Sequence, residues 1–105
     1  MRILFDQGVL VPLRRALPNH DVWTAYEMGW TELSNGALLK RADAEFDVLV
    51  TTDQGIRFQQ NLVGVRLAIL ILPTTNWSAI NTRVETVAQA LDGLHPGAVV
   101  ALDWR

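Results

Sequence analysis

The chain alternates short apolar runs with longer segments in which apolar residues recur at every third or fourth position. A short apolar run bounded by turn residues is typical of a buried strand, whereas the longer spacing is typical of an amphipathic helix. Five runs predict strands, and they lie within residues 3–5, 20–26, 47–52, 66–73 and 98–104. The fourth run, RLAILILP, is almost continuously apolar, which indicates a strand that is buried on both faces of a parallel sheet.

The segments between these runs predict four helices. A proline suits the first turn of the first helix, and serine, threonine or asparagine can cap two of the others. The expected starts are Pro12, Ser34 or Asn35, a point within residues 54–63, and Thr75 or Asn76. In the last helix the apolar residues over 77–91 form one stripe, and we expect that helix to run unbroken to Gly93.

Strands that alternate with helices predict right-handed β-α-β units, and therefore a mainly parallel sheet with helices on both faces. We expect an α/β fold, a three-layer α/β/α sandwich of about five strands, in one domain that spans residues 1–105. Five strands in this rhythm most often take the order 2-1-3-4-5, which places the first and third strands side by side. A content of 50% hydrophobic and 19% charged residues suits a globular domain.

The composition excludes several kinds of site. The chain has no cysteine, which excludes disulfides and thiolate chemistry, and its two histidines do not make a histidine-rich metal site. The net charge of −2 argues against a broadly basic nucleic-acid-coating protein, although eight of the nine cationic residues are arginines, which suit phosphate contacts. The longest apolar run, LAILIL, is far shorter than a membrane span, and the start MRILFD is no secretory signal. We therefore expect a cytoplasmic protein without a membrane partner.

The tripeptide Asp-Gln-Gly occurs twice, at residues 6–8 and 53–55, each time directly after a predicted strand. With the expected strand order, Asp6 and Asp53 lie at neighbouring carboxyl ends, at the switch point where open α/β sheets bind ligands. Two carboxylates held together repel each other, and a divalent cation removes that cost, since Mg²⁺ is commonly held by one or two carboxylates. The alternative is structural, because aspartate often caps the helix after a strand and glycine is an ordinary turn residue.

Other polar residues are candidates for the same site, each with a structural alternative. Glu27 is either a third carboxylate or a surface residue, and Arg57 is either a contact for a substrate phosphate or a solvated charge. Asn35 is either a helix cap or a contact for a phosphate or metal, and Trp30 either packs in its loop or stacks a base. The further candidates for contacting a phosphate or orienting water are Gln7, Gln54 and Asn76. The remaining tryptophans, expected to pack, are Trp23, Trp77 and Trp104.

Four segments, MRILFDQGV, NHDVWTAYEMGW, LSNGALL and FDVLVTTDQGIRF, carry a resemblance to a known family. In their order and spacing the chain resembles the compact PIN-like domains of bacterial toxin–antitoxin operons, over roughly residues 1–75. The resemblance implies a Mg²⁺- or Mn²⁺-dependent ribonuclease with Asp6, Asp53 and Glu27 as catalytic residues, the first two of which bind the metal. It also implies RNA as the substrate and a cognate antitoxin as a partner.

The chain departs from the family pattern at Gln7, Asn35 and Gly55, where the pattern has acids. Each change removes a negative charge, and a site for a hard cation weakens when it loses carboxylates. Two functions therefore stay open: a metal-dependent ribonuclease, or a catalytically inactive module that binds a partner protein or RNA. A sensor that binds a phosphate or nucleotide is a third. The apolar last strand, if it lies at a sheet edge, could pair with a second subunit in a homodimer.

Overall fold

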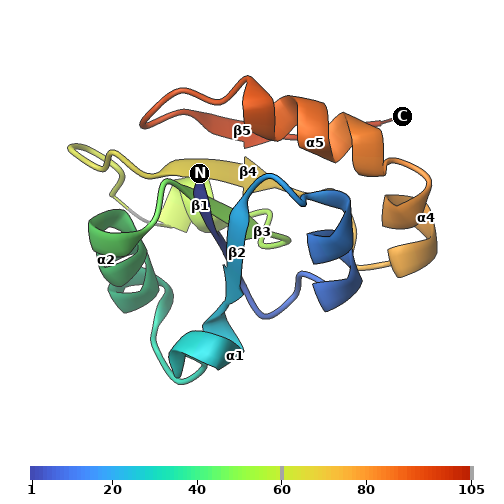
Figure 1. Cartoon of the computed structure of the whole chain (residues 1–105). Coiled ribbons are helices and arrows are strands. Elements are labelled where there is room, and N and C mark those ends of the chain that lie inside the picture. Colours follow the sequence, from blue (N-terminus) through green and yellow to red (C-terminus); the bar gives the residue numbers. More distant parts are fainter. Residues whose placement is uncertain (60, 105) are drawn as a thin grey trace.

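The computed structural model describes residues 1–59 and 61–104, apart from the side chain of Gln59. Its elements are β1 (Arg2–Phe5), the 3-10 helix η1 (Val11–Ala16), β2 (Asp21–Thr24), α1 (Ala25–Met28), α2 (Asn35–Glu45), β3 (Val48–Thr51), α3 (Ile56–Gln59), β4 (Ala68–Ile71), α4 (Trp77–Asn81), α5 (Val84–Asp92) and β5 (Val99–Ala101). The described strands form one sheet in the order β2-β1-β3-β4-β5, and every neighbouring pair is parallel. Figure 1 shows this sheet with helices around it. The predicted α/β class, parallel sheet and strand order are confirmed.

Alternating side chains of the strands divide the core between the two faces of the sheet. On one face, Ile3 and Phe5 of β1 belong to a cluster with residues of η1, α4 and α5. On the other face, Leu4 belongs to a cluster with residues of α1, α2 and α3. Every residue of β3 and of β4 is buried, as predicted for the apolar run at 66–73. The sheet is therefore the middle layer of a three-layer sandwich.

The prediction of one unbroken helix over residues 77–91 is wrong, because the structure divides this segment into α4 and α5. At the break, the Thr82 hydroxyl donates to the Ala79 carbonyl oxygen at 2.9 Å, and Arg83 leaves the helical backbone conformation with a φ of −126°. A threonine side chain that bonds to nearby backbone competes with the helical hydrogen bonds. The apolar stripe survives the break, because both helices contribute buried residues to the same cluster.

A short helix, α1, directly follows β2, where the sequence pattern predicted strand and loop. The Thr24 side chain accepts a hydrogen bond from the Glu27 N–H at 3.1 Å, and the Glu27 carboxylate accepts one from the Thr24 N–H at 3.0 Å. These reciprocal bonds form a capping box, whose sequence signature is Thr-x-x-Glu. Gly29, with a φ of 74°, ends the helix in the left-handed conformation that glycine tolerates.

The structure decides between the alternatives for Trp30 and differs from the expectation for Trp23. Trp30 is only 7% exposed and meets the Phe46 ring edge-on, with 6.0 Å between the ring centroids, so packing is the correct alternative for Trp30. Trp23, expected to pack, is 38% exposed on the edge strand β2.

The last strand, β5, forms the other edge of the sheet. The predicted pairing with a second subunit requires β5 to be an edge strand, and the homodimer itself stays a prediction. No helix in the described ranges is long and apolar enough to cross a membrane.

Candidate functional site

Asp6 and Asp53 lie just beyond the neighbouring carboxyl ends of β1 and β3. The parallel ladder continues one residue past β1, because the Asp6 N–H donates to the Val50 carbonyl oxygen at 3.0 Å. Thr51, the last residue of β3, links the two acids. Its hydroxyl donates to Asp6 Oδ2 at 2.9 Å and accepts from the Asp53 N–H at 3.1 Å, and the residue is fully buried. The structure therefore brings both predicted metal-binding aspartates into one polar group, here called the Asp6–Asp53 cluster, which consists of Asp6, Asn35, Thr51 and Asp53.

All four carboxylate oxygens of the two aspartates accept hydrogen bonds. The donors are the Gln7 and Gly55 N–H groups, the Thr51 hydroxyl and the Asn35 side-chain amide, at 2.8, 2.9, 2.9 and 3.1 Å respectively. Hydrogen bonds to an ionised carboxylate are stronger than those between neutral groups. Each aspartate therefore fixes the loop that follows it and is stabilised by groups of the protein itself.

Asn35 reaches the cluster from the first turn of α2. The cap of this helix is Ser34, whose side chain accepts from the Ala37 N–H at 3.3 Å. The Asn35 side chain is therefore free to leave the helix, and its Nδ2 donates to Asp53 Oδ2 at 3.1 Å. Because a carboxylate can only accept, the amide nitrogen is the atom that must face it. Asn35 is therefore not the cap of α2, and its side chain bonds to Asp53. The alternative, a contact for a phosphate or metal, stays a prediction.

The two glutamines of the repeated tripeptide tie their loops to neighbouring segments. Gln7 Nε2 donates to the Thr31 carbonyl oxygen in the loop before α2, at 2.6 Å. Gln54 Nε2 donates to the Leu72 carbonyl oxygen just after β4, also at 2.6 Å. Each of these bonds uses a hydrogen of the side-chain amide to hold the loop. The described role of the glutamines is therefore structural, with their side-chain oxygens left as acceptors.

Gly8 lies against Thr52, the residue that precedes Asp53. A Cβ atom at position 8 would overlap the Thr52 Oγ1 atom, so the loops after β1 and β3 approach more closely than another residue would allow. Gly8 does not belong to the glycines with positive φ. Close packing of the two loops, rather than an unusual backbone angle, explains this glycine.

Glu27 lies outside the Asp6–Asp53 cluster. Its carboxylate completes the capping box of α1 and forms an ion pair with Arg14 of η1, which donates from Nη1 to Oε2 at 3.4 Å and from Nη2 to Oε1. The hydrogen bonds from Arg14 and from the Thr24 backbone lower the pKa of Glu27 below its ordinary value. Within the described part of the chain, no three histidine, cysteine, aspartate or glutamate side chains gather where they could hold a metal. The predicted trio of Asp6, Asp53 and Glu27 is therefore not brought together.

The chemistry of the cluster fits a hydrogen-bonded polar group better than an acidic metal centre. A divalent cation at Asp53 Oδ2 would have to share this oxygen with the Asn35 amide hydrogens, which carry partial positive charge. The affinity for a hard cation rises with the number and charge of the ligand oxygens, and the cluster offers only two carboxylates. Donor groups of the chain already offset the charge of both aspartates, so the cluster needs no cation to hold it together.

A cavity of about 810 Å³ opens at the carboxyl ends of β4 and β5, and we call it the carboxyl-end cavity. Gln54, Arg57 and Asn76, three of the five predicted substrate-binding residues, line it, and the other two do not. Gln54 directly follows Asp53, so this cavity adjoins the Asp6–Asp53 cluster along the chain. Its lining is completed by Pro73, Thr74, Ala79, Ala101, Leu102, Asp103 and Trp104.

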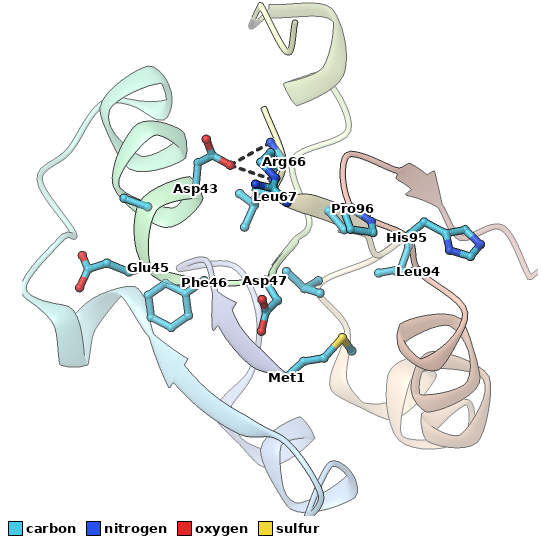
Figure 2. Close-up of a pocket in the computed structure, with 13 residues that line it drawn as sticks. Met1, Asp43, Glu45, Phe46, Asp47, Arg66, Leu67, Leu94, His95 and Pro96 are labelled. Carbon is cyan, nitrogen blue, oxygen red and sulfur yellow. Dashed lines mark hydrogen bonds between the residues drawn. The ribbon is translucent and has the colours of Figure 1, made fainter. Parts of the chain in front are cut away.

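A second cavity, of about 510 Å³, lies at the amino ends of the strands and contains none of the predicted site residues (Figure 2). Two of the acids that line it, Asp43 and Asp47, accept hydrogen bonds from the backbone. Asp43 Oδ1 accepts from the Arg66 and Leu67 N–H groups at 2.9 and 2.8 Å, which the dashed lines in Figure 2 mark. Asp47 accepts from the Arg2 N–H at 2.8 Å. These bonds hold the segments that enter β4 and β1, so the acids have a structural role.

Thr51 and Trp104 are the two residues most important to these sites that the sequence did not single out. Thr51 carried a signal, because a polar residue between an apolar run and an aspartate is well placed to bond to a carboxylate. Trp104 was expected to pack, and it does contact the core, but it also lines the carboxyl-end cavity. No local spacing could have revealed this second contact, because β5 must first be placed beside β4 before its end faces the cavity.

Comparison of the chain with protein-family models, curated proteins and solved structures gave no match. The resemblance to PIN-like domains therefore stays a prediction from the sequence. The α/β fold and the contacts of the cluster rest on the structure, and the function has to be inferred from their chemistry.

Proposed function

We propose that this chain is a PIN-like module that binds single-stranded RNA without cleaving it. The observation that carries the proposal is the hydrogen bond from the Asn35 amide to Asp53 Oδ2, at 3.1 Å. Where the PIN-like pattern has a second acid, this chain has an amide, and that amide is turned toward the remaining acid. A donor group therefore occupies the position from which a carboxylate would have helped to bind a cation.

The other two departures from the family pattern act in the same direction. Gln7 and Gly55 each donate a backbone N–H to an aspartate oxygen, at 2.8 and 2.9 Å. Neither residue adds a carboxylate, so the repulsion that a metal would relieve stays small. With fewer charged ligands, the affinity for Mg²⁺ or Mn²⁺ falls. The three departures together favour a site that binds a polar ligand over one that activates water through a metal.

Support for RNA as the ligand comes from residues beside the cluster. The Arg57 guanidinium carbon lies 5.0 Å from the centroid of the Phe58 ring, and both residues are exposed. Guanidinium planes and aromatic rings are surfaces on which unpaired bases stack, and arginine also binds phosphate. The amides of Gln54 and Asn76 line the adjacent cavity and offer hydrogen bonds to base edges. Recognition of this kind requires no metal.

A metal-dependent ribonuclease of the toxin–antitoxin kind is the second candidate, and one observation favours it. Thr51 holds Asp6 and Asp53 in a single cluster, and one or two carboxylates are often enough to hold Mg²⁺ together with waters. In that function Asp6 and Asp53 would hold Mg²⁺ or Mn²⁺, which would supply charge neutralisation and activation of water. A cognate antitoxin would then be the expected partner protein.

The test is an assay of binding and cleavage with a fluorescein-labelled single-stranded RNA, run in EDTA and again in millimolar Mn²⁺. We expect the fluorescence anisotropy to rise saturably in EDTA and the RNA to stay intact on a denaturing gel in both conditions. Arg57→Ala should weaken binding about tenfold, because it removes a charged hydrogen-bond donor. Arg41→Ala is the matched control, since Arg41 lies on α2 beside Trp30 and does not line the cavity. Cleavage that requires Mn²⁺ and is lost in Asp6→Asn would establish the second candidate instead.

A further inference from the structure

We infer that the carboxyl-end cavity is a pocket for one unstacked nucleotide of RNA, with its base on Trp104 and its phosphate at Arg57. This inference rests on the proposed RNA binding and adds the place and the unit that is recognised. The cavity volume of about 810 Å³ falls within the range of roughly 300–1,000 Å³ that is usual for ligand pockets. Its walls come from segments that meet only in the fold: the loops after β3 and β4, α3, α4 with its cap, and the end of β5 with the segment that follows.

Trp104 supplies the stacking surface. Its side chain is partly buried, packs against the core cluster that contains α4 and α5, and also lines the cavity. The Arg83 guanidinium carbon lies 6.0 Å from the centroid of the Trp104 ring system. These contacts fix the indole before a ligand arrives, so that stacking costs little conformational freedom. A nucleobase can stack on such a ring whatever its identity, because every base has a π-face.

Polar side chains around the cavity retain hydrogen-bonding groups for a base or ribose. Asn76 uses its Oδ1 to accept from the Ala79 N–H at 3.2 Å, which leaves its amide hydrogens as donors. Thr74 Oγ1 accepts from the Asn76 N–H at 3.0 Å, which leaves the hydroxyl proton as a donor. Gln54 donates to the Leu72 carbonyl oxygen, which leaves its own side-chain oxygen as an acceptor. The cavity therefore offers both donors and an acceptor, as the edge of a base requires.

The positive charge of Arg57 places the phosphate of the nucleotide on its side of the cavity. The guanidinium of Arg57, on α3, makes no ion pair with the described residues, and its paired donors match phosphate geometry. The phosphate of the nucleotide therefore lies at Arg57, and the base lies toward Trp104, on the other side of the cavity lining.

The experiment titrates the four ribonucleoside 5′-monophosphates into the full chain in EDTA and follows the tryptophan indole N–H signals by NMR. The chain has four tryptophans, and the signal of Trp104 is assigned by its loss in Trp104→Phe. We expect a saturable shift of the Trp104 signal with the monophosphates, and little shift with inorganic phosphate. Trp23 lies on β2, at the opposite edge of the sheet, and its signal is the internal control.

Substitutions at Trp104 test whether the pocket contributes to the affinity for RNA. Trp104→Ala should weaken binding of the labelled RNA about tenfold, whereas Trp104→Phe keeps an aromatic face and should weaken it only about twofold. Trp23→Phe should have no effect. Circular dichroism shows whether each variant is folded. If Trp104→Ala does not fold, the NMR titration of the unaltered chain is the test of the pocket.

The possible results separate this inference from the proposed function. RNA binding by the unaltered chain, without a shift of the Trp104 signal on addition of monophosphate, overturns the pocket and leaves RNA binding intact. A saturable Trp104 shift without any binding of the longer RNA supports a nucleotide pocket and contradicts the proposed function. If neither RNA nor a monophosphate binds, both are overturned.

Discussion

The two Asp-Gln-Gly tripeptides have parallel roles in the structure, with different partners. Each aspartate accepts an N–H from its own loop and one further donor from another residue of the cluster. Each glutamine donates to the backbone of a neighbouring segment. In the first copy the glycine permits close packing against the loop of the second. The same three residues recur because two adjacent parallel strands end in tight loops that must pack against each other.

Thr51 is the residue on which the link between these loops depends. Thr51→Val keeps the shape of the side chain but removes the hydroxyl, which leaves Asp6 Oδ2 and the Asp53 N–H without their partner. We expect the free energy of unfolding to fall by about 1–3 kcal/mol, measured by urea denaturation. Thr86→Val, on the exposed side of α5, is the matched control and should change it by less than about 0.5 kcal/mol. Equal effects at the two positions would show that the Thr51 hydroxyl does not link the aspartates.

Among the elements, the sequence predicted the sheet better than the ends of the helices. Strand order and burial follow from apolar runs that involve many residues, so no single contact can reverse them. The break between α4 and α5 depends instead on the hydroxyl of Thr82, and α1 depends on the reciprocal bonds of Thr24 and Glu27. Side-chain bonds of this kind compete with the hydrogen bonds of the helix backbone, and small differences in stability decide where a helix begins or ends. A pattern of apolar residues contains no information about these bonds.

In the candidate site, too, the features that follow from strand order were predictable, and those that depend on single side-chain contacts were not. The meeting of Asp6 and Asp53 follows from the strand order, because both residues end adjacent strands. For Glu27 the Thr-x-x-Glu signature of a capping box was present in the sequence, but the ion pair with Arg14 could not be predicted, since Arg14 lies on a different element. The placement of Trp104 in the cavity also required the packed sheet. Contacts between segments distant in the chain therefore account for most of what the sequence did not reveal.

The capping box of α1 makes a prediction about pH. Bonds from Arg14 and Thr24 lower the pKa of Glu27 in the folded chain, so the folded state favours the ionised carboxylate more than the unfolded state does. The stability from this residue is thus fully present above the unfolded pKa of about 4.3 and is lost as pH falls through the lowered folded value. We expect Glu27→Gln to reduce the free energy of unfolding at neutral pH, and most of the difference to vanish in acid. Urea denaturation across this pH range measures it.

The matched control for this prediction is Glu45→Gln. Glu45 lies in the last turn of α2, is exposed, and has no side-chain hydrogen bond among the residues that the structure describes. Removal of its charge should change the free energy of unfolding little, because the side chain makes no such bond. A Glu27→Gln effect that stays constant from neutral to acidic pH would contradict the role of the bonds from Arg14 and Thr24.

For the molecule as a whole, the two ends of the sheet have different characters. The carboxyl ends of β1 and β3 meet at the Asp6–Asp53 cluster, and those of β4 and β5 open into the carboxyl-end cavity. At the amino ends, acids hold the backbone of segments that enter the strands (Figure 2). Ligands of open α/β sheets usually bind at the carboxyl ends. The distribution of groups therefore favours a binding surface there, with two hydrogen-bonded aspartates beside an arginine and an aromatic ring.

Calorimetric titration of Mn²⁺ tests whether the Asn35 amide beside Asp53 disfavours a metal ion at the Asp6–Asp53 cluster. We expect no saturable binding by the unaltered chain at millimolar Mn²⁺. Asn35→Asp exchanges the donor beside Asp53 for a carboxylate and should create a saturable site, which the additional substitution Asp6→Asn should remove. Saturable binding by the unaltered chain that disappears in the Asp6→Asn/Asp53→Asn double variant would overturn this expectation and favour a metal-dependent nuclease.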